Sequence, residues 1–98
     1  MELKKYIAKE KETVMAFKLT NEIYLELVDA LFKGGVPFEF GYHDDDPYIR
    51  LPICGGGEEE AHIGDYIAPF GSCFRVYKKA LFEDRFELES EASQGREV

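Results

Sequence analysis

One amphipathic segment, TNEIYLELVDALFKGG at residues 20–35, lies among short alternating segments, and this contrast constrains the fold more than any other feature. Its apolar residues recur at spacings of three and four, which predicts a helix at about 21–33. Thr20 or Asn21 can serve as the N-cap, and Gly34 can end the helix in a left-handed conformation. The apolar stripe expected to face the core consists of Tyr24, Leu27, Val28, Leu31 and Phe32.

Segments with a period of two precede and follow this helix. Residues 3–9 and 13–19 come before it and predict two strands. In the second of these strands, the face expected to point inward consists of Met15, Phe17 and Leu19. The stretch VPFEFGYH follows the helix and predicts a strand. Its inner face is expected to consist of Phe38, Phe40 and Tyr42.

Later segments complete the predicted sheet. A returning strand is expected at 48–53, AHI and YIA flank Gly64-Asp65, and SCFRVY at 72–77 predicts another strand. KKALFED can form one helical turn before RFELE closes the sheet. We therefore predict the α+β class, with a small, twisted, mostly antiparallel sheet of five to seven short strands and one helix, at about 21–33, packed on one face.

Three turns are predicted from their composition. The acidic turn DDDP is expected to end at Pro47, and CGGGEEE is expected to form a flexible hairpin tip. In Gly64-Asp65, the glycine supplies a positive φ and the aspartate bonds to the local backbone. This last turn is expected to help the sheet to close.

The length of the chain, 98 residues, predicts a single domain, which we place at 1–88. The polar residues 89–98 contain little to bury, so we expect them to form a disordered acidic tail. No apolar run approaches the roughly 20 residues that span a bilayer, and the N-terminus lacks the apolar region of a signal peptide. We therefore expect a cytoplasmic protein in which Cys54 and Cys73 are free thiols.

The negative charge is concentrated in the middle of the chain. The net charge is −8, and residues 39–65 contain eight carboxylates against one arginine, Arg50. Such a field repels nucleic acid and membrane surfaces and attracts a basic partner. We expect acidic hairpin tips at 44–46 and 58–60, separated by about 17–20 Å along a strand of five or six residues. The predicted partner-binding residues are Asp44, Asp45, Asp46, Glu58, Glu59, Glu60 and Asp65.

Other patterns give weaker indications of chemistry. The stretch HDDD at 43–46 offers an imidazole and carboxylates, but it lacks calcium-loop spacing, so we favour a solvated turn. CGGGEEE contains the glycines of a phosphate loop, but its three glutamates would repel phosphate. A thiolate–imidazole pair would need a positive environment that neither Cys54 nor Cys73 has. We therefore expect no metal site, no cofactor, no catalytic residue and no enzymatic activity.

One basic cluster is interleaved with aromatic residues in the last third of the chain. Basic and aromatic residues together can stack single-stranded nucleic acid. We interpret this pattern instead as a strand with rings facing inward and charges outward, and we expect no direct nucleic-acid binding because the net charge opposes it. The cluster consists of Arg75, Lys78, Lys79 and Arg85.

Two stretches, KKYIAKEKETVMAFKLTNEIYLELVDAL and HIGDYIAPFG with LFEDRFE, resemble small accessory proteins of tailed phages and prophages. The chain departs from that family at Lys79, where a proline is usual, and in its acidic middle. The resemblance implies a phage origin, a small α+β domain and no assigned activity. The matching residues are Gly64, Asp65, Tyr66, Ile67, Gly71, Leu81, Phe82, Glu83, Phe86 and Glu87.

These observations together predict a function in binding. We expect a phage-derived acidic protein that inhibits a host nucleic-acid-handling defence complex, as anti-CRISPR proteins do, by presenting its acidic tips to a basic channel. The expected partner is a basic host protein or nucleoprotein, with no membrane involved. Two alternatives stay open. One is a phage structural or packaging accessory protein, and the other is a protein that binds a signalling nucleotide, which would require Arg50, Arg75 and Arg85 to converge.

Overall fold

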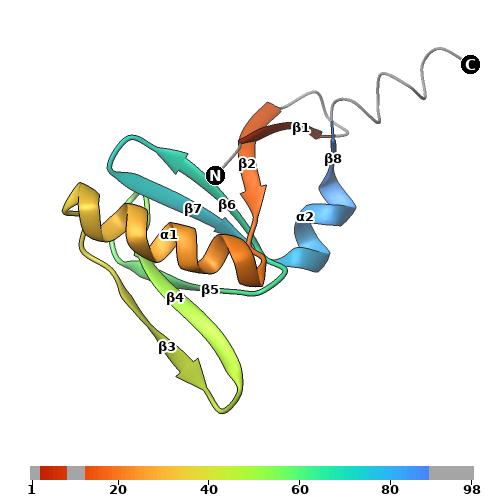
Figure 1. Cartoon of the computed structure of the whole chain (residues 1–98). Helices are drawn as coiled ribbons and strands as arrows, with labels where there is room; N and C mark the ends of the chain where they lie inside the picture. Colours follow the sequence, from red (N-terminus) through yellow and green to blue (C-terminus); the bar gives the residue numbers. More distant parts are fainter. Residues whose placement is uncertain (1–2, 9–12, 89–98) are drawn as a thin grey trace, which may run out of the picture.

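A computed structural model describes residues 3–8 and 13–88 of the chain. Figure 1 shows the arrangement of its strands and helices. In chain order the elements are β1 (Lys4–Ala8), β2 (Thr13–Lys18), α1 (Asn21–Gly34), β3 (Glu39–His43), β4 (Asp46–Pro52), β5 (Glu58–His62), β6 (Tyr66–Phe70), β7 (Cys73–Tyr77), α2 (Lys79–Arg85) and β8 (Phe86–Leu88). The predicted α+β class is confirmed. The predicted disordered tail at 89–98 lies outside the described residues.

The strands form two sheets, and the pairings within both are antiparallel. One sheet has five strands in the order β7-β6-β2-β1-β8, and the other has three in the order β3-β4-β5. β8 pairs with β1 and so closes the larger sheet, as RFELE predicted. Neither of the two helices in the described ranges is long and apolar enough to cross a membrane.

Helix α1 begins where the sequence predicted and ends one residue later. The Thr20 hydroxyl caps it by accepting a hydrogen bond from the Ile23 N–H at 3.2 Å. The left-handed C-cap is Gly35, with φ 69°, rather than Gly34, which stays helical. Phe32 is 78% exposed and does not belong to the buried stripe, because it lies on the flank of the face that carries Tyr24, Leu27 and Leu31.

Strand β2 contributes to two separate apolar clusters, one on each of its faces. Val14 and Ala16 pack with Phe82 and Phe86 from the C-terminal part of the chain. Phe17 and Leu19 pack with α1 on the opposite face. The prediction that Met15 points into the core was wrong. Met15 shares the face of Phe17 but lies beyond the part that α1 covers, and it is 46% exposed.

The aromatic rings at positions 38, 40 and 42 lie on the predicted inner side of the sheet, but two of the three are exposed. Phe38 packs against the core, but Phe40 is 53% and Tyr42 63% exposed. The register places Phe40 beside the buried Ile49, so these rings lie on the inward side of the sheet. They remain exposed because β3 is the edge strand and extends past the cover that α1 provides.

Short-range links hold the two sheets together. Cys54, in the loop after β4, forms a disulfide with Cys73 at the start of β7, with a Cα–Cα distance of 5.1 Å. Beside it, the Cys54 N–H donates to the Phe74 carbonyl at 3.0 Å, and Ile53 forms a parallel bridge with Phe74. The prediction of two free thiols was therefore wrong, because the fold brings together two cysteines that lie 19 positions apart.

Helix α2 is longer than the single turn that was predicted. It spans 7 residues and buries Phe82 almost completely. The Phe82 ring stacks on Tyr66 at 4.1 Å and on Phe86 at 4.6 Å between ring centroids. This stack of rings fills the space between α2 and the five-stranded sheet.

Candidate functional site

The three-stranded sheet has one packed face and one polar face. Its inner face carries Ile49, Leu51 and Ala61, which are buried against α1. Side chains of paired residues point to the same side of a sheet, so the register defines the opposite face. We call it the polar face, and it consists of Glu39, Gly41, His43, Asp46, Tyr48, Arg50, Pro52, Glu58, Glu60 and His62.

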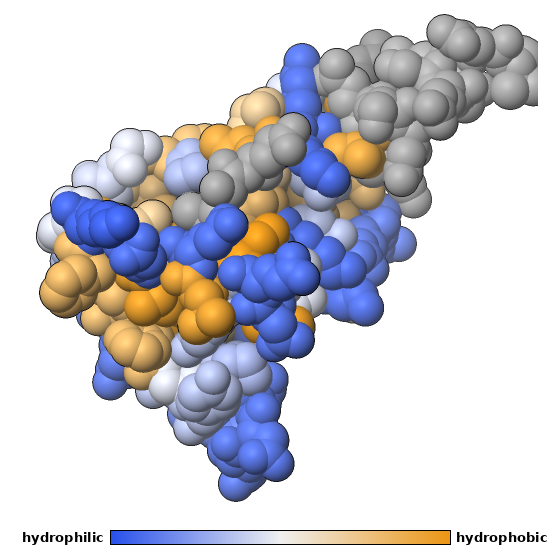
Figure 2. Space-filling model, in the orientation of Figure 1, coloured by the Kyte–Doolittle hydropathy of each residue, from blue (hydrophilic) through white to orange (hydrophobic). Residues whose placement is uncertain are grey.

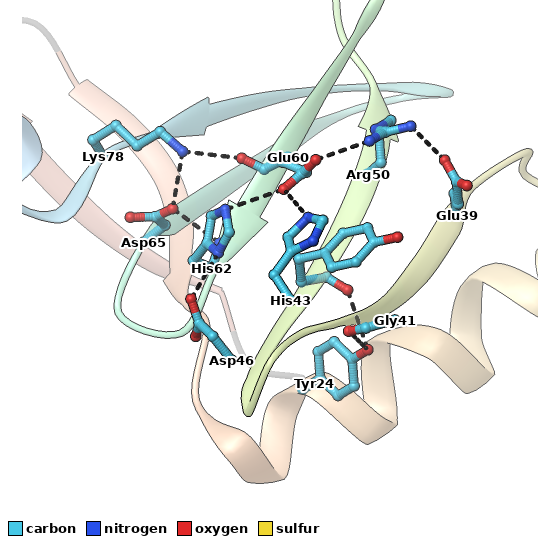
Figure 3. A network of polar contacts seen from close by, with 11 residues as sticks. Tyr24, Glu39, Gly41, His43, Asp46, Arg50, Glu60, His62, Asp65 and Lys78 are labelled. Carbon is cyan, nitrogen blue, oxygen red and sulfur yellow. Dashed lines mark hydrogen bonds and ion pairs between the residues drawn. The ribbon is translucent and has the colours of Figure 1, made fainter.

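Glu60 lies at the centre of the polar face (Figure 3). Arg50 donates from Nη2 to its Oε2 at 2.8 Å, and from Nη1 to Glu39 on the other side. The other carboxylate oxygen, Oε1, lies 3.0 Å from Nε2 of His43 and 3.3 Å from Nε2 of His62. One carboxylate thus joins side chains from all three strands.

The two imidazoles are held in different ways. The His43 ring stacks on Tyr48 with 4.2 Å between ring centroids, which directs its Nε2 towards Glu60. Nδ1 of His62 lies 3.2 Å from Oδ2 of Asp46, while its Nε2 faces Glu60. Only a protonated imidazole carries N–H on both nitrogens, so His62 donates to both carboxylates at once only when it is charged.

The electrostatics keep the central carboxylate ionised. The hydrogen bond from Arg50 lowers the pKa of Glu60 below its ordinary value, and the neighbouring His43 lowers it further. Glu60 in turn raises the pKa of Arg50. At neutral pH Glu60 therefore acts as a fixed acceptor. An ionised carboxylate that is paired with a guanidinium has no proton to donate. The arrangement therefore suits a role in holding the strands together or in recognition better than a role in acid catalysis.

The tip between β3 and β4 carries exposed aspartates, as predicted. Asp44 and Asp45 form a two-residue turn between the paired residues His43 and Asp46. Asp44 has a φ of 56°, a left-handed conformation that aspartate tolerates. The prediction that Pro47 ends the turn was wrong, because β4 already begins at Asp46 and Pro47 pairs within it.

The glutamates at 58–60 do not form a hairpin tip. The tip consists of the glycine-rich loop before them, in which Gly55, Gly56 and Gly57 all have positive φ, and the glutamates belong to β5. Glu58 lies opposite Pro52 at the far end of β4 and is exposed. Glu59 lies on the inner side, and Glu60 is engaged with Arg50. Of these three glutamates, Glu58 is the one that remains as an exposed charge at that end of β4.

Asp65 is a buried structural residue and does not lie on the exposed acidic surface. It is 6% exposed, and its Oδ2 accepts from the His62 N–H at 2.9 Å. Its Oδ1 accepts from the Lys79 N–H at 3.1 Å, at the start of α2. With Gly64 at φ 101°, this matches the predicted turn chemistry. Asp65 fastens the β5–β6 turn to α2 and is unavailable to a partner.

Several residues of the polar face were missed from the sequence. Tyr48 received no role, His62 was not predicted to be functional, and Arg50 was considered only as a ligand for phosphate. Lys78, which lies beside this face, was assigned to the basic cluster. The register of the strands carries the missing information, because it places Arg50 of β4 directly opposite Glu60 of β5. The side chain of Lys78 donates to the Glu60 carbonyl at 3.0 Å, so it belongs with this face and not with a separate basic patch.

The alternative chemistries receive no support from the geometry. Arg50, on β4, is engaged with Glu39 of β3 and Glu60 of β5. Arg75 lies over the Phe70 ring on the other sheet at 4.9 Å, so these guanidinium groups do not converge. Within residues 3–8 and 13–88, no group of three or more histidine, cysteine or carboxylate side chains is arranged to hold a metal ion.

Comparison with known proteins adds no assignment. No family model, no curated protein and no solved structure matches this chain. The resemblance to phage accessory proteins therefore stays a prediction from the sequence.

Proposed function

We propose that this protein is a binding protein whose acidic surface docks on a basic surface of a partner that handles nucleic acid. The observation that carries the proposal is the placement of exposed carboxylates at both ends of β4. Asp44, Asp45 and Asp46 lie at one end and Glu58 lies at the other. Asp46 and Pro52 lie six positions apart, so the two acidic ends are about 20 Å apart along the strand.

The interior of the polar face supports this role by holding the acidic ends in place. Arg50, His43 and Glu60 link the three strands between the acidic ends. The charges are thus presented on a braced sheet, and a rigid arrangement loses less conformational entropy on binding than a mobile one does. Long-range attraction from the whole acidic region would also accelerate the encounter with a basic partner.

We propose a host nucleic-acid-handling defence complex, such as a CRISPR effector, as the partner, with the protein acting as an inhibitor in the host cytoplasm. A row of fixed negative charge has the chemistry needed to occupy a channel built for phosphates. The reducing cytoplasm would open the Cys54–Cys73 disulfide, so both redox forms belong in any test.

The test compares two variants with the same loss of charge. Asp44→Asn, Asp45→Asn and Glu58→Gln neutralise the acidic ends, and asparagine suits the left-handed conformation at position 44. The control, Glu22→Gln, Asp29→Asn and Asp84→Asn, removes three exposed charges from the two helices. Immobilised wild-type protein, oxidised and reduced, is used to capture partners from bacterial lysate at low and high salt.

The proposal expects capture of a basic nucleic-acid-handling protein that weakens with salt, persists in the control and is lost in the acidic-end variant. Circular dichroism and thermal unfolding show whether each variant is folded. If the acidic-end variant captures the same protein as strongly as the wild type does, the acidic ends do not bind it. Capture of capsid or packaging proteins instead would favour the structural alternative.

A further inference from the structure

Strand β3 is an open edge with little of the usual protection against pairing. It lies at the end of the order β3-β4-β5, and no strand within residues 3–8 and 13–88 pairs with its outer side. Its sequence, EFGYH, contains no lysine or proline, and its register with β4 runs without a bulge. By contrast, Ile53 and Cys54 contact the outer edge of β7 at Phe74.

The pairing with β4 determines which backbone groups of β3 point outward. A two-residue turn closes on a hydrogen-bonded pair, here His43 and Asp46, and such pairs alternate along an antiparallel ladder. Gly41 and Tyr48 form the next such pair. The Tyr24 hydroxyl confirms this phase, because it reaches the carbonyls of both, at 3.3 and 3.1 Å, from one position between the strands. The N–H and C=O groups of Phe40 and Tyr42 therefore point outward.

The sequence of β3 is complementary to itself when it is read in the opposite direction. If Gly41 of one copy lies opposite Gly41 of another, Phe40 lies opposite Tyr42 and Glu39 lies opposite His43. In this register the outward-pointing groups of Phe40 and Tyr42 hydrogen-bond to each other. Aromatic pairs and opposite-charge pairs across strands are both stabilising. We propose that two copies pair through β3, antiparallel about a two-fold axis at Gly41, to form one six-stranded sheet.

The two faces of this junction fit their surroundings. On the inner side, the exposed rings of Phe40 and Tyr42 would cover each other, beside the Phe38 ring that stacks on Phe40 at 5.6 Å. Figure 2 shows apolar colour over α1 and just below it, where the chain runs on into β3. A contact there would remove this surface from water in both copies.

On the polar side, the junction extends the existing alternation of charge. Glu60, Arg50 and Glu39 already form a row across the sheet, and Glu39 would meet His43 of the second copy, which contacts its own Glu60. No like charges lie opposite each other in this register. Gly41, at the axis, has no side chain, and the Tyr48 ring of the same copy lies over its backbone, 3.2 Å from where a Cβ would stand.

The first measurement is the mass of the protein in solution across a range of concentrations. Light scattering or sedimentation should show a concentration-dependent rise from 11.3 kDa to twice that value. Tyr42→Lys places a charge on the open edge and removes an aromatic pair at two symmetric places. At 0.5–1.5 kcal/mol for each aromatic pair, self-association should weaken about tenfold or more. Leu81→Lys is the matched control, since it places a lysine at an exposed apolar position on α2.

The second measurement tests the register. A spin label at Asp45→Cys lies in the turn just beyond β3, about three residue spacings from the axis in each copy, so the two labelled Cα atoms should be about 20–25 Å apart. A monomeric wild type at every concentration would overturn the proposal. So would a dimer that persists in folded Tyr42→Lys protein, or a label distance that differs by more than about two residue spacings, roughly 7 Å.

Discussion

The two sheets of this protein differ in how completely their surfaces are used. The five-stranded sheet is packed by α2 and a stack of rings centred on Phe82, and even its β7 edge is contacted by Ile53 and Cys54. The three-stranded sheet packs one face against α1 and leaves a polar face and the β3 edge exposed. The difference suggests that the first sheet mainly supplies stability and the second mainly supplies recognition.

The connections between the sheets strengthen this contrast. The Asp65 carbonyl accepts from the Leu19 N–H at 2.8 Å, at the end of β2, while the Asp65 carboxylate accepts from the backbone before and after it. The disulfide forms a second connection, at the opposite end of β5. Both connections anchor strands β4 and β5, whereas β3 is attached through its pairing with β4, the chain from α1 and side-chain contacts of Glu39 and His43. The exposed edge is therefore the least anchored part of the smaller sheet.

The largest expected effect comes from truncating a ring in each sheet. Phe82→Ala removes the centre of the ring stack and should lower the free energy of unfolding by about 3–5 kcal/mol. Phe40→Ala removes a half-exposed ring that stacks on Phe38 and should lower that free energy by about 1 kcal/mol. Urea denaturation measures both free energies, at a protein concentration low enough that the proposed pairing through β3 does not contribute. Equal losses would contradict the division of roles between the sheets.

Opening the disulfide should have a smaller and more local effect. Cys54→Ser with Cys73→Ser should lower the free energy of unfolding by about 2–4 kcal/mol, because the bond closes a loop across 19 positions. Hydrogen exchange should then rise in β4 and β5 more than in β1 and β2, which the bond does not anchor. The reduced wild type is the matched control and should behave in the same way. A uniform rise across both sheets would show that the disulfide stabilises the whole molecule equally.

The sequence was most informative where local chemistry decides the structure. The helix, its Thr20 cap and the Gly64-Asp65 turn each depend on neighbours within a few positions, and all three were predicted correctly. The misplaced residues depend on pairing at a distance. Whether Phe40 is covered depends on which strand lies at the edge, and alternation within one segment carries no information about that.

The candidate site shows the same limit. The three aspartates after His43 were recognised as an exposed acidic turn from composition alone. The engagement of Glu60 with Arg50 and His43 requires the registers of two strand pairs, which the sequence does not specify. The cysteine pair is a further case, because two cysteines in a chain do not show whether the fold brings their Cα atoms within bonding range.

The smallest predicted effect concerns the polar face itself. It distinguishes the contribution of the Glu60–Arg50 contact from that of the overall charge of the face. The pKa of Glu60 is held below its ordinary value of 4.5, first by the hydrogen bond from Arg50, so folding favours the ionised form. The stability that Glu60 contributes is therefore present above pH 4.5 and is lost as the pH falls through the lowered value. Because the Glu60–Arg50 pair is only partly buried, the effect should be small and should shrink in high salt.

Thermal unfolding from neutral to acidic pH tests this prediction with Glu60→Gln and a matched Glu58→Gln. The difference in melting temperature between wild type and Glu60→Gln should be largest at neutral pH and should disappear at acidic pH, because protonation removes the same charge that the substitution removes. Glu58→Gln removes a carboxylate from the same strand and face without removing the contact with Arg50. If both variants showed the same dependence on pH, the stabilisation would come from the overall charge of the face and not from the bond between Glu60 and Arg50.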